Sequence, residues 1–215
     1  MNVQCFQCNP VQENCFVVSD ETKEAVVIDC GAFFDEERRA VVDYLRSGGL
    51  TLRHVLCTHA HFDHIFGLDT LYAEFGVKPR LHAADEFLYN GMNVQMNSFL
   101  GVAYNRQMPP LGDPLADDEE ISFGHHRLKV LHTPGHSPGS VLFYLEEEKM
   151  LFAGDTLFRM SVGRTDLEGG SWQQLMESLH RVVAKLPADV KVYTGHGPAT
   201  TIGDEVRRNP YLNPS

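Results

Sequence analysis

The interleaving of strand-like and helix-like segments is the feature that most restricts the fold of this chain. Alternating and β-branched apolar residues predict strands over residues 3–6, 14–18, 25–29, 54–57, 80–82, 128–132, 140–145, 150–153 and 190–194. Helical spacing and capping residues predict helices over residues 35–46, 65–75, 84–89 and 171–186. Since strands and helices alternate in both halves of the chain, we expect an α/β protein.

Two features of this pattern are specific enough to test. Asp35 is expected to cap the N-terminus of the helix over residues 35–46. Residues 91–118 have no clear periodicity and are predicted to form a long loop, which either packs on the domain or covers a ligand.

The size and composition of the chain fit one globular domain over residues 1–215. The sequence has 215 residues, of which 43% are hydrophobic and 22% charged, so a disordered or fibrous protein is not expected. No apolar run approaches the roughly 20 residues that cross a bilayer. The first residues lack a basic segment followed by an apolar run, so we expect a cytoplasmic protein with no membrane contact.

The charge of the chain bears on its partners. The formal net charge is −11, whereas proteins that bind polyanions are usually basic because contacts with phosphates supply much of the affinity. We therefore expect a small-molecule substrate and no nucleic acid.

The five cysteines suggest no disulfide framework. Their number is odd, and a cytoplasmic chain keeps its thiols reduced. Cys5 and Cys8 form a Cys-x-x-Cys pair, but no second pair follows at zinc-site spacing. We interpret them as strand and loop residues, with a redox or metal pair as the alternative.

A dense group of metal-binding side chains follows the strand predicted over residues 54–57. His59, His61, Asp63 and His64 fall within six residues, where a strand is expected to give way to a helix. Imidazole and carboxylate are ligands that zinc, iron and manganese accept. In an extended segment His59 and His61 point to the same side, and the following turn directs Asp63 and His64 to a second point. One segment can thus supply ligands for two ions.

Three further candidates also follow predicted strands. His136 lies in a Gly/Pro-rich turn, Asp155 comes after Gly154 at a strand end, and His196 lies between two glycines after the last predicted strand. Functional groups gather on loops at the ends of the strands of a rigid sheet. Each of the three alone is weak evidence, but in this order they support a common metal centre.

These segments together resemble the metallo-β-lactamase superfamily, and its glyoxalase II-like hydrolases in particular. The resemblance runs from residues 9–16 to residues 209–210. It implies a four-layer αβ/βα sandwich with two divalent metal ions, expected to be zinc, with iron or manganese as alternatives. It further implies a first metal on His59, His61 and His136. The second metal would take Asp63, His64 and His196, and Asp155 would bridge the two ions.

The resemblance implies hydrolysis of a glutathione thioester such as S-lactoylglutathione, with Asp63 and Asp155 in the catalytic centre. Arg164 follows Gly163 where glyoxalase II has a basic residue that helps bind glutathione, but Asp166 stands where an aromatic residue is common. The chain ends 19 residues after His196, so we expect the short form without the C-terminal helical glutathione-binding domain.

Other activities of the same superfamily stay open. Persulfide dioxygenases share the Gly-Arg-Thr-Asp sequence of residues 163–166 but hold one iron on two histidines and an aspartate. A lactone hydrolase would use the same ligands. A true β-lactamase is disfavoured, because many of those place a cysteine where this chain has Asp155. All seven ligand positions carry a histidine or an aspartate, which disfavours a non-catalytic metal-binding module.

Overall fold

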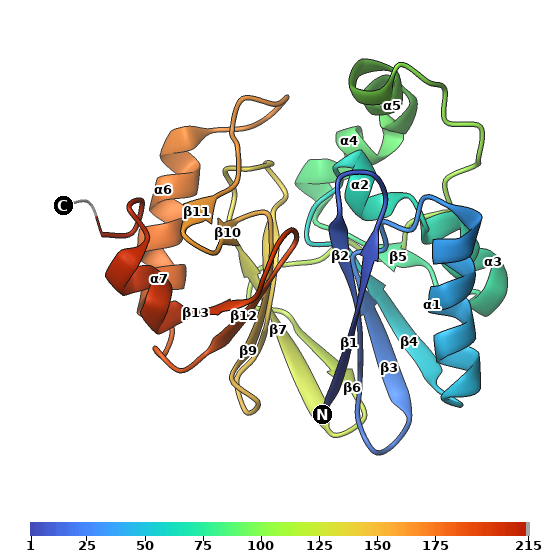
Figure 1. Cartoon of the computed structure of the whole chain (residues 1–215), viewed down its shortest axis with the longest axis horizontal. Coiled ribbons are helices and arrows are strands. Elements are labelled where there is room, and N and C mark those ends of the chain that lie inside the picture. Colours follow the sequence, from blue (N-terminus) through green and yellow to red (C-terminus); the bar gives the residue numbers. More distant parts are fainter. Residues whose placement is uncertain (214–215) are drawn as a thin grey trace. The chain divides into compact units, whose positions relative to one another are not determined.

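The computed structural model describes residues 1–213 as two compact units. The first comprises Met1–Pro114 with Phe123–His125, and the second comprises Leu115–Ser122 with His126–Ser215. Each unit has its own sheet and helices, as expected of an α/β protein (Figure 1). The expectation of a single domain over residues 1–215 stays a prediction.

The first unit is built on a five-stranded sheet in the order β1-β2-β3-β4-β5. Its strands are β1 Asn2–Cys8, β2 Glu13–Ser19, β3 Glu24–Ile28, β4 Thr51–Leu56 and β5 Pro79–Arg80. β1, β2 and β3 pair antiparallel, whereas β3, β4 and β5 pair parallel. Parallel pairing brings the carboxyl ends of β3 and β4 to the same edge, where Asp29 N donates to Leu56 O (2.9 Å).

Helices cover one face of this sheet and continue beyond its edge (Figure 1). They are α1 Asp35–Ser47, α2 Phe62–Ile65, α3 Leu68–Phe75, the 3₁₀ turn η1 Ala83–Asp85, α4 Glu86–Asn90 and α5 Met92–Leu100. α1 and α3 pack on the sheet and contribute Val41, Leu45, Leu68 and Leu71 to the buried core of the unit. Burial of these apolar faces is the main stabilising contribution to the helix layer.

The second unit has a six-stranded sheet in the order β13-β12-β9-β8-β7-β6, and a two-stranded hairpin. The strands are β6 Glu120–Phe123, β7 His126–His132, β8 Val141–Leu145, β9 Met150–Gly154, β12 Lys191–Thr194 and β13 Thr200–Thr201, with β10 Leu157–Phe158 and β11 Ser161–Val162 in the hairpin. The helical segments are α6 Trp172–Arg181, the 3₁₀ turn η2 Val183–Lys185 and α7 Ile202–Arg208. Leu175 and Leu179 of α6 pack with Val192 of β12 in a separate core.

Several sequence predictions need correction. Residues 91–118 are not wholly irregular, because α5 occupies Met92–Leu100 with Met92 and Met96 buried. The helix predicted over residues 65–75 begins only at Leu68, and a separate short helix, α2, ends at Ile65. Between them Gly67 N donates to Cys30 O (2.7 Å). The helix over residues 171–186 ends at Arg181 and continues as a 3₁₀ turn.

The cap of α1 and the C-terminal segment also differ from expectation. Phe34, not Asp35, is the N-cap residue, and Glu37 accepts from Phe33 N (2.8 Å) and Phe34 N (3.0 Å) at the helix start. The helix α7 was not predicted after residue 196; Thr201 caps it by accepting from Asp204 N (3.1 Å). Across residues 1–213, none of the helices has both the length and the apolar character that a membrane span requires.

Candidate metal centre

The ligands expected from residues 59–64 lie together at the end of β4, and we call them the N-terminal ligand group: His59, His61, Asp63 and His64. All four are buried. The ring centroids of His59 lie 4.1 Å from those of His64 and 4.8 Å from those of His61. Three imidazoles therefore lie close together in this unit.

Asp29, which follows β3, orients this group through contacts of its carboxylate. Its carboxylate accepts from Thr58 N (2.7 Å) and Thr58 Oγ1 (2.7 Å), and its Oδ2 lies 3.0 Å from His64 Nδ1. Thr58 Oγ1 donates its hydrogen to Asp29, so it accepts from His59 Nδ1 at 3.0 Å. With the hydrogens so assigned from their partners, His59 and His64 carry the proton on Nδ1, and Nε2 is the ring nitrogen that bears a lone pair.

The turn that carries Asp63 is held by residues from two distant loops. Asn9 Nδ2 donates to Asp63 O (2.9 Å) and to Gly31 O (3.0 Å). A Cβ at Gly31 would lie 2.1 Å from Asp63 O and 2.2 Å from Glu13 Oε2, so only glycine lets these backbones approach. The position of Asp63 is therefore fixed by tertiary contacts with Asn9 and Gly31.

Parallel pairing positions Asp155 and His196 in the second unit. β9 and β12 run parallel with Gly154 opposite Thr194, and Gly195 N donates to Gly154 O (2.7 Å). The residues that follow the two strands therefore emerge at one edge of the sheet. His136 lies in the loop between β7 and β8, which reaches the same edge because β8 is antiparallel to β9.

These three residues, the C-terminal ligand group, converge on one oxygen atom. Asp155 Oδ2 lies 3.5 Å from His136 Nε2 and 3.6 Å from His196 Nε2. A carboxylate with an imidazole on either side fits the bridging position that the resemblance implies. The donor set suits a divalent cation, since imidazole and carboxylate are common zinc and iron ligands.

The loop at Gly163 and Arg164 orients His136 through its backbone. His136 Nδ1 donates to Arg164 O (2.7 Å), which leaves Nε2 facing Asp155. A Cβ at Gly163 would lie 1.9 Å from Asp155 O and 3.0 Å from His136 Nδ1. Glycine is thus needed at position 163 because the loop passes directly against Asp155.

The side chain of Arg164, expected to bind substrate, already has an anionic partner. Its guanidinium makes two 2.7 Å hydrogen bonds to the carboxylate of Asp166, and more than half of the side chain is exposed. The guanidinium lowers the pKa of the Asp166 carboxyl to about 2, chiefly by hydrogen bonding. Asp166, which replaces the aromatic residue common at this position, therefore competes for the cation that a substrate carboxylate would need.

The Cys-x-x-Cys pair of the sequence forms neither a disulfide nor a shared site in the structure. Cys5 is exposed and Cys8 is buried, and all five cysteines are free thiols. Cys8 Sγ lies 3.6 Å from Phe6 O. The interpretation as strand and loop residues fits this arrangement.

Sequence reasoning did not identify Asp29, Thr58 or Asn9 as parts of the site. Asp29 is the last residue of a predicted strand. Its backbone is left-handed (φ 50°), and the aspartate residue type does not predict that conformation. Position alone could have pointed to it, because Asp29 follows β3 as His59 follows β4.

Comparison with known proteins identifies the family of this chain. The family model of the metallo-β-lactamase superfamily matches residues 8–196. The hydroxyacylglutathione hydrolase GloC of Haemophilus influenzae is 32% identical over 220 residues, which cover 99% of each chain.

Solved structures that resemble nearly the whole chain include two with more than a third of their residues identical. One is the B3 metallo-β-lactamase BLEG-1, with a TM-score of 0.90, 37% identity and coverage of 99% of this chain and 100% of the other. The second is TTHA1623 in a di-iron-bound form, with a TM-score of 0.86, 38% identity and coverage of 98% and 100%. The matched region spans β2 through β12 and contains every expected ligand. With this family match and the two ligand groups at strand ends, the chain belongs to the metallo-β-lactamase superfamily and has its fold.

Proposed function

We propose that the protein is a binuclear metal-dependent hydrolase of thioesters, with glutathione thioesters such as S-lactoylglutathione as substrates. The observation that carries the proposal is the Asp155 carboxylate, whose Oδ2 faces His136 Nε2 and His196 Nε2 at nearly equal distances. The 32% identity to a hydroxyacylglutathione hydrolase along the full chain supports the choice of substrate class.

In this proposal the N-terminal and C-terminal ligand groups together hold two divalent ions. His59, His61 and His136 would bind the first, and Asp63, His64 and His196 the second, with Asp155 bridging. Zinc suits this set of ligands. Iron is the alternative, since the similar protein TTHA1623 has a di-iron-bound form. The carboxylates of Asp63 and Asp155 offset part of the charge that two dications bring.

The residues of the chain prepare this centre for hydrolysis. Bound ions would lower the pKa of a water molecule and polarise a substrate carbonyl. Asp29 and the Arg164 carbonyl hold the Nδ1 protons of His64 and His136, so each ring keeps its Nε2 directed at the site. A thiolate leaves with little need of a proton donor, because thiol pKa values are about 8.5.

Substrate recognition involves Arg164 once its guanidinium releases Asp166 and binds a carboxylate of the substrate instead.

We further propose a cytoplasmic location, since free thiols are the usual state in a reducing compartment.

The test combines elemental analysis of the purified protein with a steady-state assay on S-lactoylglutathione. We expect two metal ions per chain and thioester hydrolysis. Asp155→Asn is expected to lower the occupancy of both positions and to reduce turnover by at least about 100-fold, because Asp155 would serve as a ligand of both ions. Asp166→Asn is the matched control, since Asp166 is an aspartate near the site that is not among the ligands; it should keep both metals.

A fully metallated protein that cleaves no thioester would refute the proposal. One tightly held iron together with oxygen consumption on a persulfide would assign a dioxygenase, and cleavage of lactones alone would assign a lactonase.

A further inference from the structure

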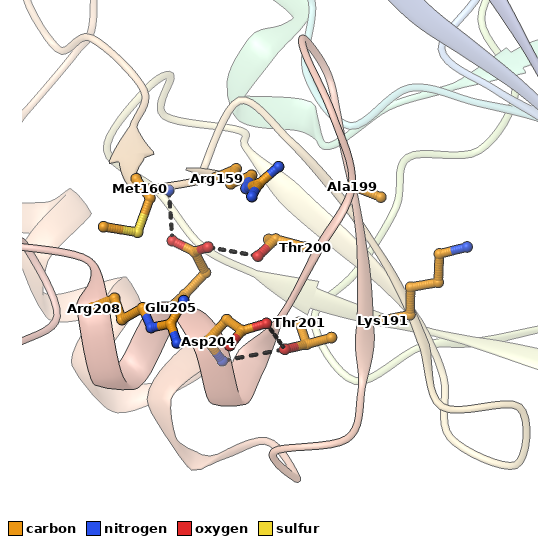
Figure 2. Close-up of a pocket in the computed structure, with 9 residues that line it drawn as sticks. All are labelled: Arg159, Met160, Lys191, Ala199, Thr200, Thr201, Asp204, Glu205 and Arg208. Carbon is orange, nitrogen blue, oxygen red and sulfur yellow. Dashed lines mark hydrogen bonds between the residues drawn. The ribbon is translucent and has the colours of Figure 1, made fainter.

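None of the candidate metal ligands lines a pocket that lies in the second unit. It has a volume of about 550 Å³ and is formed by the β10–β11 turn, the β12–β13 hairpin and α7 (Figure 2). Pockets that take small organic ligands usually measure about 300 to 1,000 Å³. The pocket is thus larger than a single inorganic ion needs.

Three cationic side chains line this pocket: Arg159, Lys191 and Arg208. Within residues 1–213, none of the three forms an ion pair with a carboxylate. Lys191 Nζ instead lies 4.6 Å from the centroid of the Tyr193 ring. Three unpaired cations around one pocket stand out in a chain of net charge −11.

The two acidic residues of the pocket are engaged by other groups. The Glu205 carboxylate is buried and accepts from Met160 N (2.8 Å) and Thr200 Oγ1 (2.6 Å) (Figure 2). It also accepts from Asn209 Nδ2 (2.8 Å). Asp204 pairs with Arg207 (2.9 Å), which does not line the pocket, and its pKa is lowered by Arg207 and by its hydrogen bond with Thr201. Arg208 also lowers the pKa of Asp204. Of the three cations, Arg208 is therefore the one whose charge a nearby carboxylate offsets most.

Hydrogen bonds hold in place the backbone segments that carry Arg159 and Lys191. Arg159 and Met160 form the two-residue turn between β10 and β11, and Glu205 binds the Met160 amide in its left-handed conformation (φ 60°). Lys191 begins β12 and pairs with Thr201 of β13. A site whose supporting backbone is already fixed loses less entropy when a ligand binds.

We propose that this pocket binds a small organic anion carrying phosphate or carboxylate groups, held by Arg159, Lys191 and Arg208. Arginine forms strong paired hydrogen bonds with both kinds of oxyanion, and the pocket volume leaves room for an organic body. This binding does not depend on the metal centre or on the proposed hydrolase activity.

Calorimetric titration of the metal-bound protein with inorganic phosphate, succinate and glycerol tests the proposal. We expect saturable binding of phosphate or succinate that weakens as salt is raised, and no binding of glycerol. Arg159→Gln and Lys191→Gln should each weaken it about 3- to 10-fold, and the double variant more. Arg181→Gln, which removes an exposed cation of α6 outside the pocket, is the matched control and should change it little.

The variants also separate the pocket from the metal centre, where phosphate could bind as well. Binding that is equal in the parent and in the Arg159→Gln/Lys191→Gln double variant would overturn the proposal, as would an equal loss in Arg181→Gln. If only phosphate binding depends on the two cations, the ligand is a phosphate ester; if succinate binding depends on them equally or more, it is a carboxylate.

Discussion

Asn9 connects the first hairpin to the turn that carries Asp63, and replacing it gives the sharpest test of how that ligand is held. The side chain makes three hydrogen bonds: to Asp63 O (2.9 Å), to Gly31 O (3.0 Å) and from Val11 N (3.0 Å). It is 6% exposed, so water cannot readily replace these partners. Each such bond contributes about 1 kcal/mol, so their loss costs about 3 kcal/mol.

The backbone of Asn9 adds a second contribution. Its φ is 56°, in the left-handed region that asparagine tolerates and alanine disfavours by about 1 kcal/mol. Asn9→Ala should therefore lower the free energy of unfolding by about 4 kcal/mol. Asn9→Gly loses the same hydrogen bonds without the strain and should lower it by about 3 kcal/mol.

Urea denaturation of the purified protein, followed by fluorescence and circular dichroism, measures both changes. Asn97→Ala, at an exposed position of α5, is the matched control and should stay within about 0.5 kcal/mol of the parent. Elemental analysis of the folded Asn9→Gly protein should also show weaker metal retention, by about 10-fold in affinity, because Asp63 loses its support. A loss below about 1 kcal/mol in Asn9→Ala, or a greater loss in the glycine variant, would refute this reasoning.

Three other predictions concern residues around the sites. Arg164→Ala should leave metal content unchanged, because it keeps the carbonyl that binds His136, and should raise KM with little change in kcat, whereas Asp166→Ala should lower KM by freeing the guanidinium. Burial raises the pKa of Tyr104 to about 12 from its ordinary 10. The stabilisation from the neutral Tyr104 hydroxyl is therefore complete below pH 10 and is lost as the pH rises through 12. In Tyr104→Phe, the free energy of unfolding should fall by about 2 kcal/mol less over this alkaline range, as urea denaturation at several pH values can measure. Folded Cys5→Ser and Cys8→Ser proteins should keep thioester hydrolysis within a few-fold; loss of activity in either would show that the thiol pair matters.

The sequence by itself determined the features that depend on residue type and on neighbours along the chain. Clustered histidines and aspartates after apolar runs indicated ligands at strand ends, and both ligand groups lie there. Most strands and the helix α1 were also predictable, because their periodicity is local. Two elements were not: α5 has a mixed polar pattern, and the strands of the β10–β11 hairpin, with two residues each, are too short for a periodic signal.

Only the tertiary structure decided which residues hold the ligands. Asp29 is 35 residues from His64, Asn9 is 54 from Asp63, and the Arg164 carbonyl is 28 from His136. Strand register and loop approach bring these atoms within hydrogen-bonding distance, and a backbone carbonyl carries no residue-type signal at all. The sequence also marked Arg164 for its charge; the fold pairs that charge with Asp166 and in addition directs the Arg164 carbonyl at His136. Ligand chemistry is a property of single side chains, whereas orientation depends on partners that only the folded chain brings into contact.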